Sequence, residues 1–164
     1  MRQPTALPIP LLSTILLVVL SSTPALAYPP QGLERVGTTT LKWGFFTIYH
    51  STLYTAEGIF DGIEPGLALE IEYRRNIRSS RFVDTARDQW QSMELYDDAR
   101  SEPWLDELSA LLPDVSRGDT ITVYVDEEQA SVFYYNPQPI GRVADPHFTT
   151  DFLAIWLDEN FNYQ

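Results

Sequence analysis

The sequence predicts an α+β fold in which helices gather against one antiparallel sheet. Two blocks of the chain, residues 36–73 and 120–135, are rich in β-branched and aromatic residues that alternate with polar ones. In residues 79–112 and 146–157 the apolar residues instead recur at helical spacing. The order is therefore strands, two helices, a hairpin and a closing helix in one domain.

The densest aromatic and β-branched stretch, residues 41–54, predicts two of the first strands. Gly44 interrupts it where a strand turns or bulges, so we expect one strand from Val36 to about Trp43 and a second over residues 45–55. Apolar side chains stand on both faces, which predicts a central pair of strands that is covered on both sides. A loop over residues 57–66 leads to a half-buried third strand over residues 67–73.

Two helices are expected next. Ser79 or Ser80 can cap the first, whose apolar face carries Phe82, Ala86, Trp90 and Met93. The second is expected to begin at residues 101–104 and to stop at Pro113.

The last part of the chain predicts a hairpin and a closing helix. Strands over residues 120–125 and 130–135 flank an acidic tip, and a short Pro- and Gly-containing segment, residues 137–141, follows. Asp145 and Pro146 are expected to cap a final helix, whose apolar stripe is Phe148, Phe152, Ile155 and Trp156.

The N-terminus predicts export. Residues 1–27 have the three parts of a secretory signal peptide: Arg2, a short apolar core over residues 11–20, and the small-x-small site that ends at Ala27. We expect a signal peptide over 1–27, a leader over 28–35 and the folded domain over 36–164. No stable membrane span remains after cleavage, and the expected location is the periplasm, with secretion as the alternative. An uncleaved anchor helix is the competing interpretation of the same segment.

Composition excludes several classes of function. The chain carries 11 Lys and Arg against 23 Asp and Glu, a formal charge of −12, which argues against nucleic acid and against docking on anionic lipid surfaces. There is no cysteine, and the two histidines, His50 and His147, are not in a ligand-spaced cluster. Neither a metal nor a cofactor is expected, since no phosphate loop or dinucleotide fingerprint occurs.

Several short motifs together resemble the bacterial chalcone isomerase-like family. They are Val36-Gly37, Leu41-Lys42-Trp43, Ile48-Tyr49, Thr52-Leu53-Tyr54, residues 69–73, the helix from Phe82 to Trp90, Arg117-Gly118-Asp119 and residues 152–157. The resemblance implies a chalcone isomerase-like fold, an antiparallel sheet curled over a layer of helices as an open-faced sandwich, with a cleft between them. Flavonoid-cyclising plant enzymes and fatty-acid-binding relatives share this fold.

The same resemblance argues against catalysis. The plant enzymes use an arginine early in the first strands, a threonine on the next strand, and a tyrosine, a lysine and an asparagine along a helix. Here Gly37 stands at the arginine position and Tyr49 at the threonine position, while Phe82, Thr85 and Gln89 stand at the helix positions. None of the five matches, so no catalytic residue is expected.

Candidate ligand-binding residues follow from this comparison and from a cluster of arginines. Phe82, Thr85 and Gln89 share one helix face, which fits either an apolar cleft wall or ordinary core and edge positions. Five arginines fall within residues 74–87 and could hold a carboxylate, or could form a solvated strand end balanced by nearby acids. The predicted cleft residues are Tyr49, Phe82, Thr85, Gln89, Arg74 and Arg81.

Three functions remain open at this point. The first is a non-catalytic, exported binder of a fatty acid or similar apolar carboxylate. The second is an isomerase (intramolecular lyase) that acts on a chalcone-like or other small apolar substrate. The third is a protein-interaction module in envelope lipid metabolism, with an unknown partner. An open apolar cavity with an arginine at its end favours the lipid; a filled interior favours the interaction module.

Overall fold

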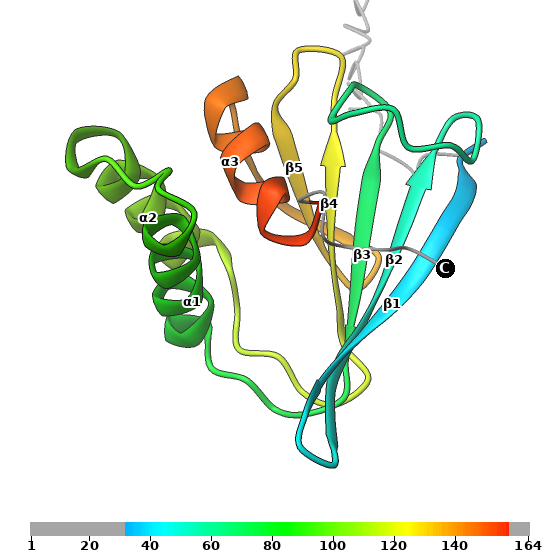
Figure 1. The fold of residues 1–164 in the computed structure, drawn as a ribbon, viewed down its shortest axis with the longest axis horizontal. Coiled ribbons are helices and arrows are strands. Elements are labelled where there is room, and N and C mark those ends of the chain that lie inside the picture. Colours follow the sequence, from blue (N-terminus) through cyan, green and yellow to red (C-terminus); the bar gives the residue numbers. More distant parts are fainter. Residues whose placement is uncertain (1–31, 158–164) are drawn as a thin grey trace, which may run out of the picture.

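A computed structural model describes residues 32–157, so the predicted signal peptide and most of the leader lie outside the described residues. The six strands form one antiparallel sheet in the order β1-β2-β3-β4-β5-β6, and the three helices lie on one side of it (Figure 1). The α+β prediction is confirmed.

The elements are β1 (Glu34–Trp43), β2 (Phe46–Thr55), β3 (Ala68–Tyr73), α1 (Ser79–Ser92), α2 (Asp98–Leu111), β4 (Thr120–Val125), β5 (Ser131–Tyr135), β6 (Gln138–Val143) and α3 (Pro146–Leu157). None of the helices in this part of the chain has the length and apolar character that crossing a membrane requires.

The first two strands form a tight hairpin at the edge of the sheet. Trp43 pairs with Phe46, and Gly44 takes a φ of +58° at the first position of the two-residue turn, where glycine adopts this conformation without strain. The predicted break at Gly44 is thus confirmed, although β1 begins at Glu34, inside the segment expected as leader.

The prediction of a central, doubly covered strand pair is wrong. The strands pair in chain order, so β1 is an edge strand, and Leu41, Trp43 and Phe46 are exposed. Apolar composition favoured a covered position, but the place of a strand in the sheet is decided by which neighbours pair with it.

The core lies between the sheet and the helices. β3 and β4 supply alternating buried residues such as Leu69, Ile71 and Val123, as their period of two predicts. Against them packs a cluster of rings with centroids 5.2–6.3 Å apart. The cluster consists of Trp90 from α1, Trp104 from α2, Phe133 from β5, and Phe148 and Phe152 from α3.

Both predicted starts of the middle helices need correction. Neither Ser79 nor Ser80 caps α1 with its side chain; the backbone N–H of Ser79 instead donates to Oδ1 of Asp114, 2.7 Å away. α2 begins at Asp98, three residues before the expected start, because Asp97 accepts a hydrogen bond from the backbone N–H of Arg100 and caps the helix. Pro103 therefore lies inside the helix.

The strand β6 was not predicted from the sequence. The segment with two prolines and a glycine pairs with β5 at the far edge of the sheet, where Pro139 is tolerated because an edge strand needs fewer ladder bonds. Gly141 lies close to α2, since a Cβ at this position would be 2.5 Å from Cδ1 of Leu111 unless that side chain moved. The glycine thus permits close packing of α2 on β6.

Candidate functional site

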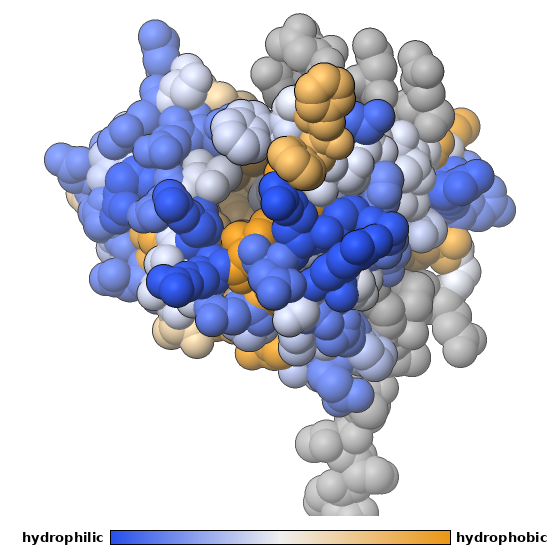
Figure 2. Space-filling model, turned by 90° about the horizontal axis from the view of Figure 1, so that it is seen from below, coloured by the Kyte–Doolittle hydropathy of each residue, from blue (hydrophilic) through white to orange (hydrophobic). Residues whose placement is uncertain are grey.

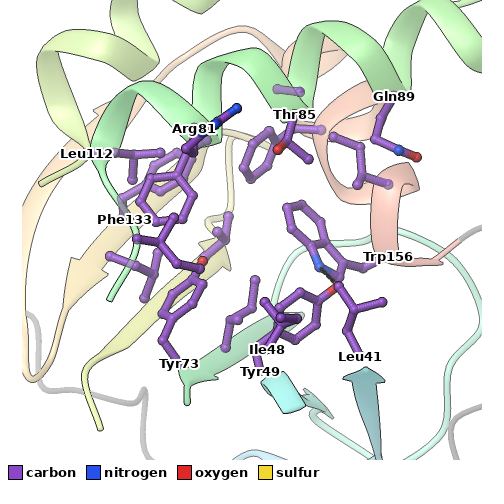
Figure 3. A pocket seen from close by; sticks show the side chains of 18 residues that line it. Leu41, Ile48, Tyr49, Tyr73, Arg81, Thr85, Gln89, Leu112, Phe133 and Trp156 are labelled. Carbon is purple, nitrogen blue, oxygen red and sulfur yellow. Dashed lines mark hydrogen bonds between the residues drawn. The ribbon is translucent and has the colours of Figure 1, made fainter. Parts of the chain in front are cut away.

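A cavity of about 260 Å³ opens between α1, α3 and the sheet. Figure 2 views the molecule from below the orientation of Figure 1. On this face the surface is hollowed, with hydrophobic side chains between hydrophilic ones. Eighteen residues line the cavity, and most of them are aliphatic or aromatic (Figure 3). The lining residues with polar groups are Tyr49, Tyr73, Arg81, Thr85, Gln89 and Trp156.

A β-bulge shapes the strand side of the cavity. Leu41 pairs with Tyr49 but Lys42 pairs with Thr47, so Ile48 is an extra residue in β2. In a regular strand Ile48 and Tyr49 would point to opposite faces, whereas here both line the cavity together with Leu41. The strands of the Leu41–Tyr54 stretch thus form part of the cavity wall through Leu41, Ile48 and Tyr49.

One face of α1 forms the opposite wall. Phe82, Thr85 and Gln89 follow one another at intervals of three and four residues, and Arg81 stands one turn before Thr85. Arg81, Thr85 and Gln89 are also exposed to solvent, so they form the rim of the cavity. Ala86 and Trp90 are buried and fasten the helix to the core.

Two tyrosines bring hydroxyl groups into the apolar wall. Nε1 of Trp156 in α3 donates to the hydroxyl oxygen of Tyr49 in β2 at 3.0 Å, a bond that joins opposite sides of the cavity. Burial raises the pKa of Tyr49, and the bond from Trp156 partly opposes this shift. Burial likewise raises the pKa of Tyr73 well above its usual range, with the neighbouring Tyr49 adding to the effect. Both phenols therefore stay neutral at physiological pH.

The Tyr73 side chain has a hydroxyl without a partner among residues 32–157. Its residue is 5% exposed, and its ring packs against Tyr49 and Phe82 at centroid distances of 6.2 and 5.4 Å. No hydrogen bond joins its oxygen to another described residue, and its side chain lines the cavity (Figure 3). Buried hydroxyls normally have a partner, so this group is available to a ligand.

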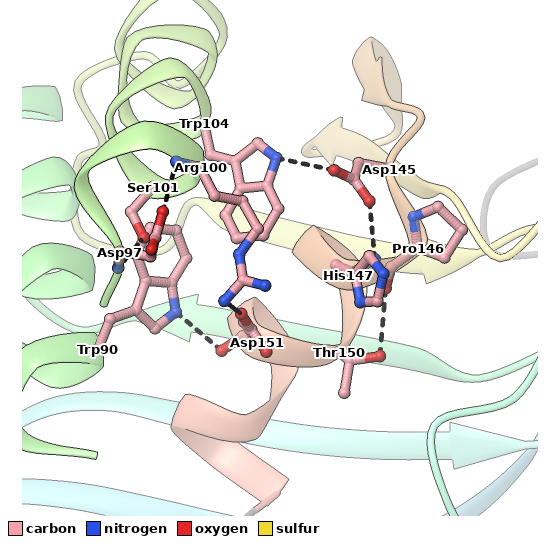
Figure 4. A network of polar contacts seen from close by, with 10 residues as sticks. All are labelled: Trp90, Asp97, Arg100, Ser101, Trp104, Asp145, Pro146, His147, Thr150 and Asp151. Carbon is pink, nitrogen blue, oxygen red and sulfur yellow. Dashed lines mark hydrogen bonds and ion pairs between the residues drawn. The ribbon is translucent and has the colours of Figure 1, made fainter. Parts of the chain in front are cut away.

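Polar contacts hold α3 in the position that closes the cavity (Figure 4). Nε1 of Trp90 donates to the backbone oxygen of Asp151 at 2.8 Å, and Nε1 of Trp104 donates to Oδ2 of Asp145 at 3.2 Å. Oδ1 of Asp145 accepts from the backbone N–H of His147, which confirms Asp145 as the predicted helix cap. One indole from α1 and one from α2 thus fasten α3, whose Trp156 reaches the cavity.

The structure brings five of the six predicted cleft residues to one cavity. Tyr49, Phe82, Thr85, Gln89 and Arg81 line it, whereas Arg74 does not; its guanidinium pairs with Glu72, with Nη1 2.6 Å from Oε1. Gly37, which stands at the family's arginine position, is also outside the lining. That these residues bind a ligand stays a prediction.

Tyr73 and Trp156 line the cavity but were not predicted as site residues. Tyr73 is the last apolar position of the alternating third strand, and Trp156 belongs to the stripe of the closing helix. Their patterns predict ordinary core residues, because strand and helix periodicity show which face is buried but not which buried residues border a cavity.

Few of the residues that line the cavity are ionisable. Its described lining contains no aspartate, glutamate, histidine or lysine, and its ionisable groups are one guanidinium and the two neutral phenols. Within residues 32–157 no group of His, Asp and Glu side chains is placed to hold a metal ion. The arrangement offers apolar contact, hydroxyl and amide hydrogen bonds, and one permanent positive charge.

Residues 31–161 match the chalcone isomerase-like family model. The chain belongs to the chalcone isomerase-like family. Among curated proteins it is similar to an uncharacterized protein of Haemophilus influenzae, with 26% identity over 137 residues that cover 84% of this chain and 67% of the relative.

Among solved structures the fold is similar to that of an Arabidopsis thaliana fatty-acid binding protein. The TM-score is 0.61 and the alignment covers 80% of this chain and 82% of the other, at 9% identity. At this identity the likeness shows the shared fold and no more.

Proposed function

We propose that this chalcone isomerase-like protein is an exported, non-catalytic binder of an apolar carboxylate such as a fatty acid. The observation that carries the proposal is an open apolar cavity with a single cationic side chain, Arg81, on its rim. The fatty-acid binding named for the structural neighbour from Arabidopsis thaliana supports the same class of ligand.

The cavity supplies the two interactions that such a ligand needs. Its apolar wall removes the acyl chain from water, which contributes roughly 25 cal/mol for each Å² of apolar surface buried. The Arg81 guanidinium presents several N–H donors to a carboxylate in a planar arrangement. No carboxylate of residues 32–157 lies within ion-pair distance of Arg81, so its charge is not already neutralised there.

Cavity size limits the ligand. Its volume of about 260 Å³ lies just under the range of about 300–1,000 Å³ that is usual for small-molecule sites. We therefore expect a short or medium acyl chain, or one end of a longer chain whose remainder lies outside. The hydroxyl of Tyr73 offers a hydrogen bond to a polar atom inside.

Displacement of a fluorescent fatty acid tests the proposal. Wild-type protein should bind the probe and lose it to unlabelled fatty acid, and native mass spectrometry of protein from its own host should show a lipid adduct. Thr85→Trp places an indole on the rim and should abolish binding. Gln91→Trp, an exposed neutral position of the same helix outside the lining, should leave binding intact.

A charge variant tests the orientation of the ligand. Arg81→Gln should weaken binding of the acid by about tenfold, since a charged hydrogen bond contributes roughly 1.5–3 kcal/mol when well formed and less at an exposed rim. It should leave the affinity for the corresponding alcohol unchanged, and Arg35→Gln is the exposed control outside the cavity. The proposal would be refuted if the native mass spectrum showed only the ligand-free protein and unlabelled fatty acid displaced no probe.

Export is the second part of the proposal. Cleavage after Ala27 would leave every described element intact, since β1 begins at Glu34. N-terminal sequencing of the protein from its host should begin at Tyr28, and cell fractionation should place it in the periplasm. An unprocessed Met1 in the soluble cytoplasmic fraction would refute this part alone.

A further inference from the structure

The hairpin between β1 and β2 carries a projecting group of aromatic side chains. Phe45, at the tip, is 104% exposed, Trp43 is 75% exposed and Phe46 is 54% exposed. Large apolar side chains that lie together in water usually mark a surface that another molecule covers. Trp and Phe are also the residues that enter the boundary between lipid headgroups and acyl chains.

Three segments meet at this end of the molecule, which we call the basic end: residues 41–48, 72–81 and 113–119. The backbone N–H of Arg74 donates to the carbonyl of Ile48 at 2.9 Å, and that of Tyr73 donates to the carbonyl of Asp119 at 2.9 Å. The Arg75 guanidinium lies over the Phe46 ring, 4.6 Å from its centroid, which places positive charge directly against the aromatic tip.

The basic end has a charge opposite to that of the rest of the chain. It holds six of the chain's 11 Lys and Arg residues but three of its 23 acidic ones, in a protein of formal charge −12. The basic residues are Lys42, Arg74, Arg75, Arg78, Arg81 and Arg117, and the acidic ones are Glu72, Asp114 and Asp119.

The acids of the basic end are already engaged. Glu72 pairs with Arg74, Asp114 accepts from Ser79, and Asp119 accepts from Ser116, Tyr135 and Asn136. Of the six basic residues, only Arg74 forms an ion pair with a carboxylate of residues 32–157. The charges of the other five are therefore not neutralised by a described carboxylate.

The cavity opens at the same end. Leu41, 42% exposed, belongs both to the exposed hairpin and to the cavity lining, and Arg81 belongs both to the basic cluster and to the rim. In Figure 2 this end shows projecting hydrophobic groups and hydrophilic groups around the hollow. The cavity therefore borders both the hairpin and the basic cluster.

We propose that the basic end docks on the surface of an anionic phospholipid bilayer, with Trp43 and Phe45 inserted among the headgroups and the unpaired arginines on lipid phosphates. The exposed rings can insert into the apolar boundary of the headgroup region, and the guanidinium groups can contact lipid phosphates. Docking in this orientation turns the cavity mouth toward the acyl chains. This last consequence rests on the proposed function, whereas docking itself does not.

Positive charge is concentrated at the basic end. The net charge of the whole chain therefore argued against docking on anionic lipid although one end can dock. The acidic remainder of the chain is repelled by an anionic surface, so it turns the basic end toward the bilayer. Docking should therefore weaken as salt rises.

Co-sedimentation of the purified protein with phosphatidylcholine vesicles, with and without phosphatidylglycerol, tests the proposal. Binding is expected to need the anionic lipid. The tip variant Trp43→Ser/Phe45→Ser should lower the partition coefficient by at least about tenfold, because a buried aromatic ring contributes roughly that factor or more. The control Ile59→Ser/Phe60→Ser removes two exposed apolar side chains from the loop between β2 and β3 and should change nothing.

Single charge variants test the phosphate contacts. Arg78→Gln and Arg117→Gln should each lower binding to anionic vesicles by about fivefold, since a basic residue near such a surface contributes about 1 kcal/mol. Arg35→Gln, exposed on β1 outside the basic end, should have little effect.

Three results would overturn the proposal. They are no vesicle binding by the wild-type protein, equal binding by the tip variant, or a concentration-dependent dimer in sedimentation velocity that the tip variant abolishes. The dimer would assign the tip to a second copy of this chain. Displacement of the fluorescent fatty acid in vesicle-free solution should be unchanged in the tip variant, so failure of docking and failure of the proposed function are distinguishable.

Discussion

Replacing Tyr73 by phenylalanine is expected to leave the protein as stable as the wild type or more stable. The change removes only a hydroxyl group, and the ring keeps its contacts with Tyr49 and Phe82. A buried hydroxyl without a hydrogen-bond partner costs about 1–3 kcal/mol, while contact of this one with the cavity lowers the cost. We expect the free energy of unfolding to stay constant or to rise by about 1 kcal/mol.

The same substitution at a second tyrosine, Tyr135, is expected to change the stability in the opposite direction. The hydroxyl of Tyr135 donates to Oδ2 of Asp119 at 2.7 Å, so Tyr135→Phe removes a charge-assisted bond and should lower the free energy of unfolding. Urea unfolding followed by circular dichroism measures both variants, with the midpoint as the readout and an unchanged slope as the test of two-state behaviour. A loss of more than about 1 kcal/mol in Tyr73→Phe would refute the reasoning, because the hydroxyl would then have a stabilising partner. If the same variant also weakens binding of the fatty acid about fivefold, the hydroxyl contacts the ligand.

Three further changes test the packing and the electrostatics. Trp90→Phe removes the indole N–H that donates to a carbonyl of α3, together with part of a ring that is 1% exposed, and should lower the free energy of unfolding by about 2–4 kcal/mol in urea titration. Gly141→Ala places a Cβ 2.5 Å from Leu111 and should cost about 1–3 kcal/mol; an unchanged melting temperature would mean that the leucine simply rotates away. The backbone N–H of Ser116 and other donors hold the pKa of Asp119 below its ordinary value of 3.8, so this carboxylate stabilises the fold above that value and the stabilisation is lost as the pH falls through the lowered pKa. Asp119→Asn should therefore reduce the loss of stability on acidification, and an unaltered acid transition would contradict the assignment.

Periodicity located the elements that are amphipathic. The alternation in β3 and β4 and the apolar spacing in α1 and α3 appear in the structure where the pattern placed them, because each of these elements buries one face against the core. The same method failed for β6, an edge strand with a proline and a glycine, and for the start of α2, where Asp97 competes successfully with Ser101 as cap. Local patterns cannot rank two capping residues or recognise a strand whose pairing depends on a neighbour.

The candidate site, like the fold, was predicted from the sequence only in part. Comparison with the family predicted Tyr49, on a strand, and Phe82, Thr85 and Gln89, on one helix face, as cleft residues, and all four line one cavity. Arg74 was grouped with Arg81 by proximity in sequence, yet its guanidinium turns to Glu72.

By itself, the sequence determined the α+β class, the family resemblance and the faces of the amphipathic elements. Tertiary structure alone decided that the aromatic stretch from Leu41 to Tyr54 lies at an edge, that a bulge turns Ile48 and Tyr49 toward one cavity, and that six basic side chains gather beside its mouth in an acidic protein. The physical reason is that hydrophobic and helical periods are properties of neighbouring residues. Exposure, cavities and charge clusters are instead set by contacts between segments such as 41–48, 72–81 and 113–119, which are distant in the chain.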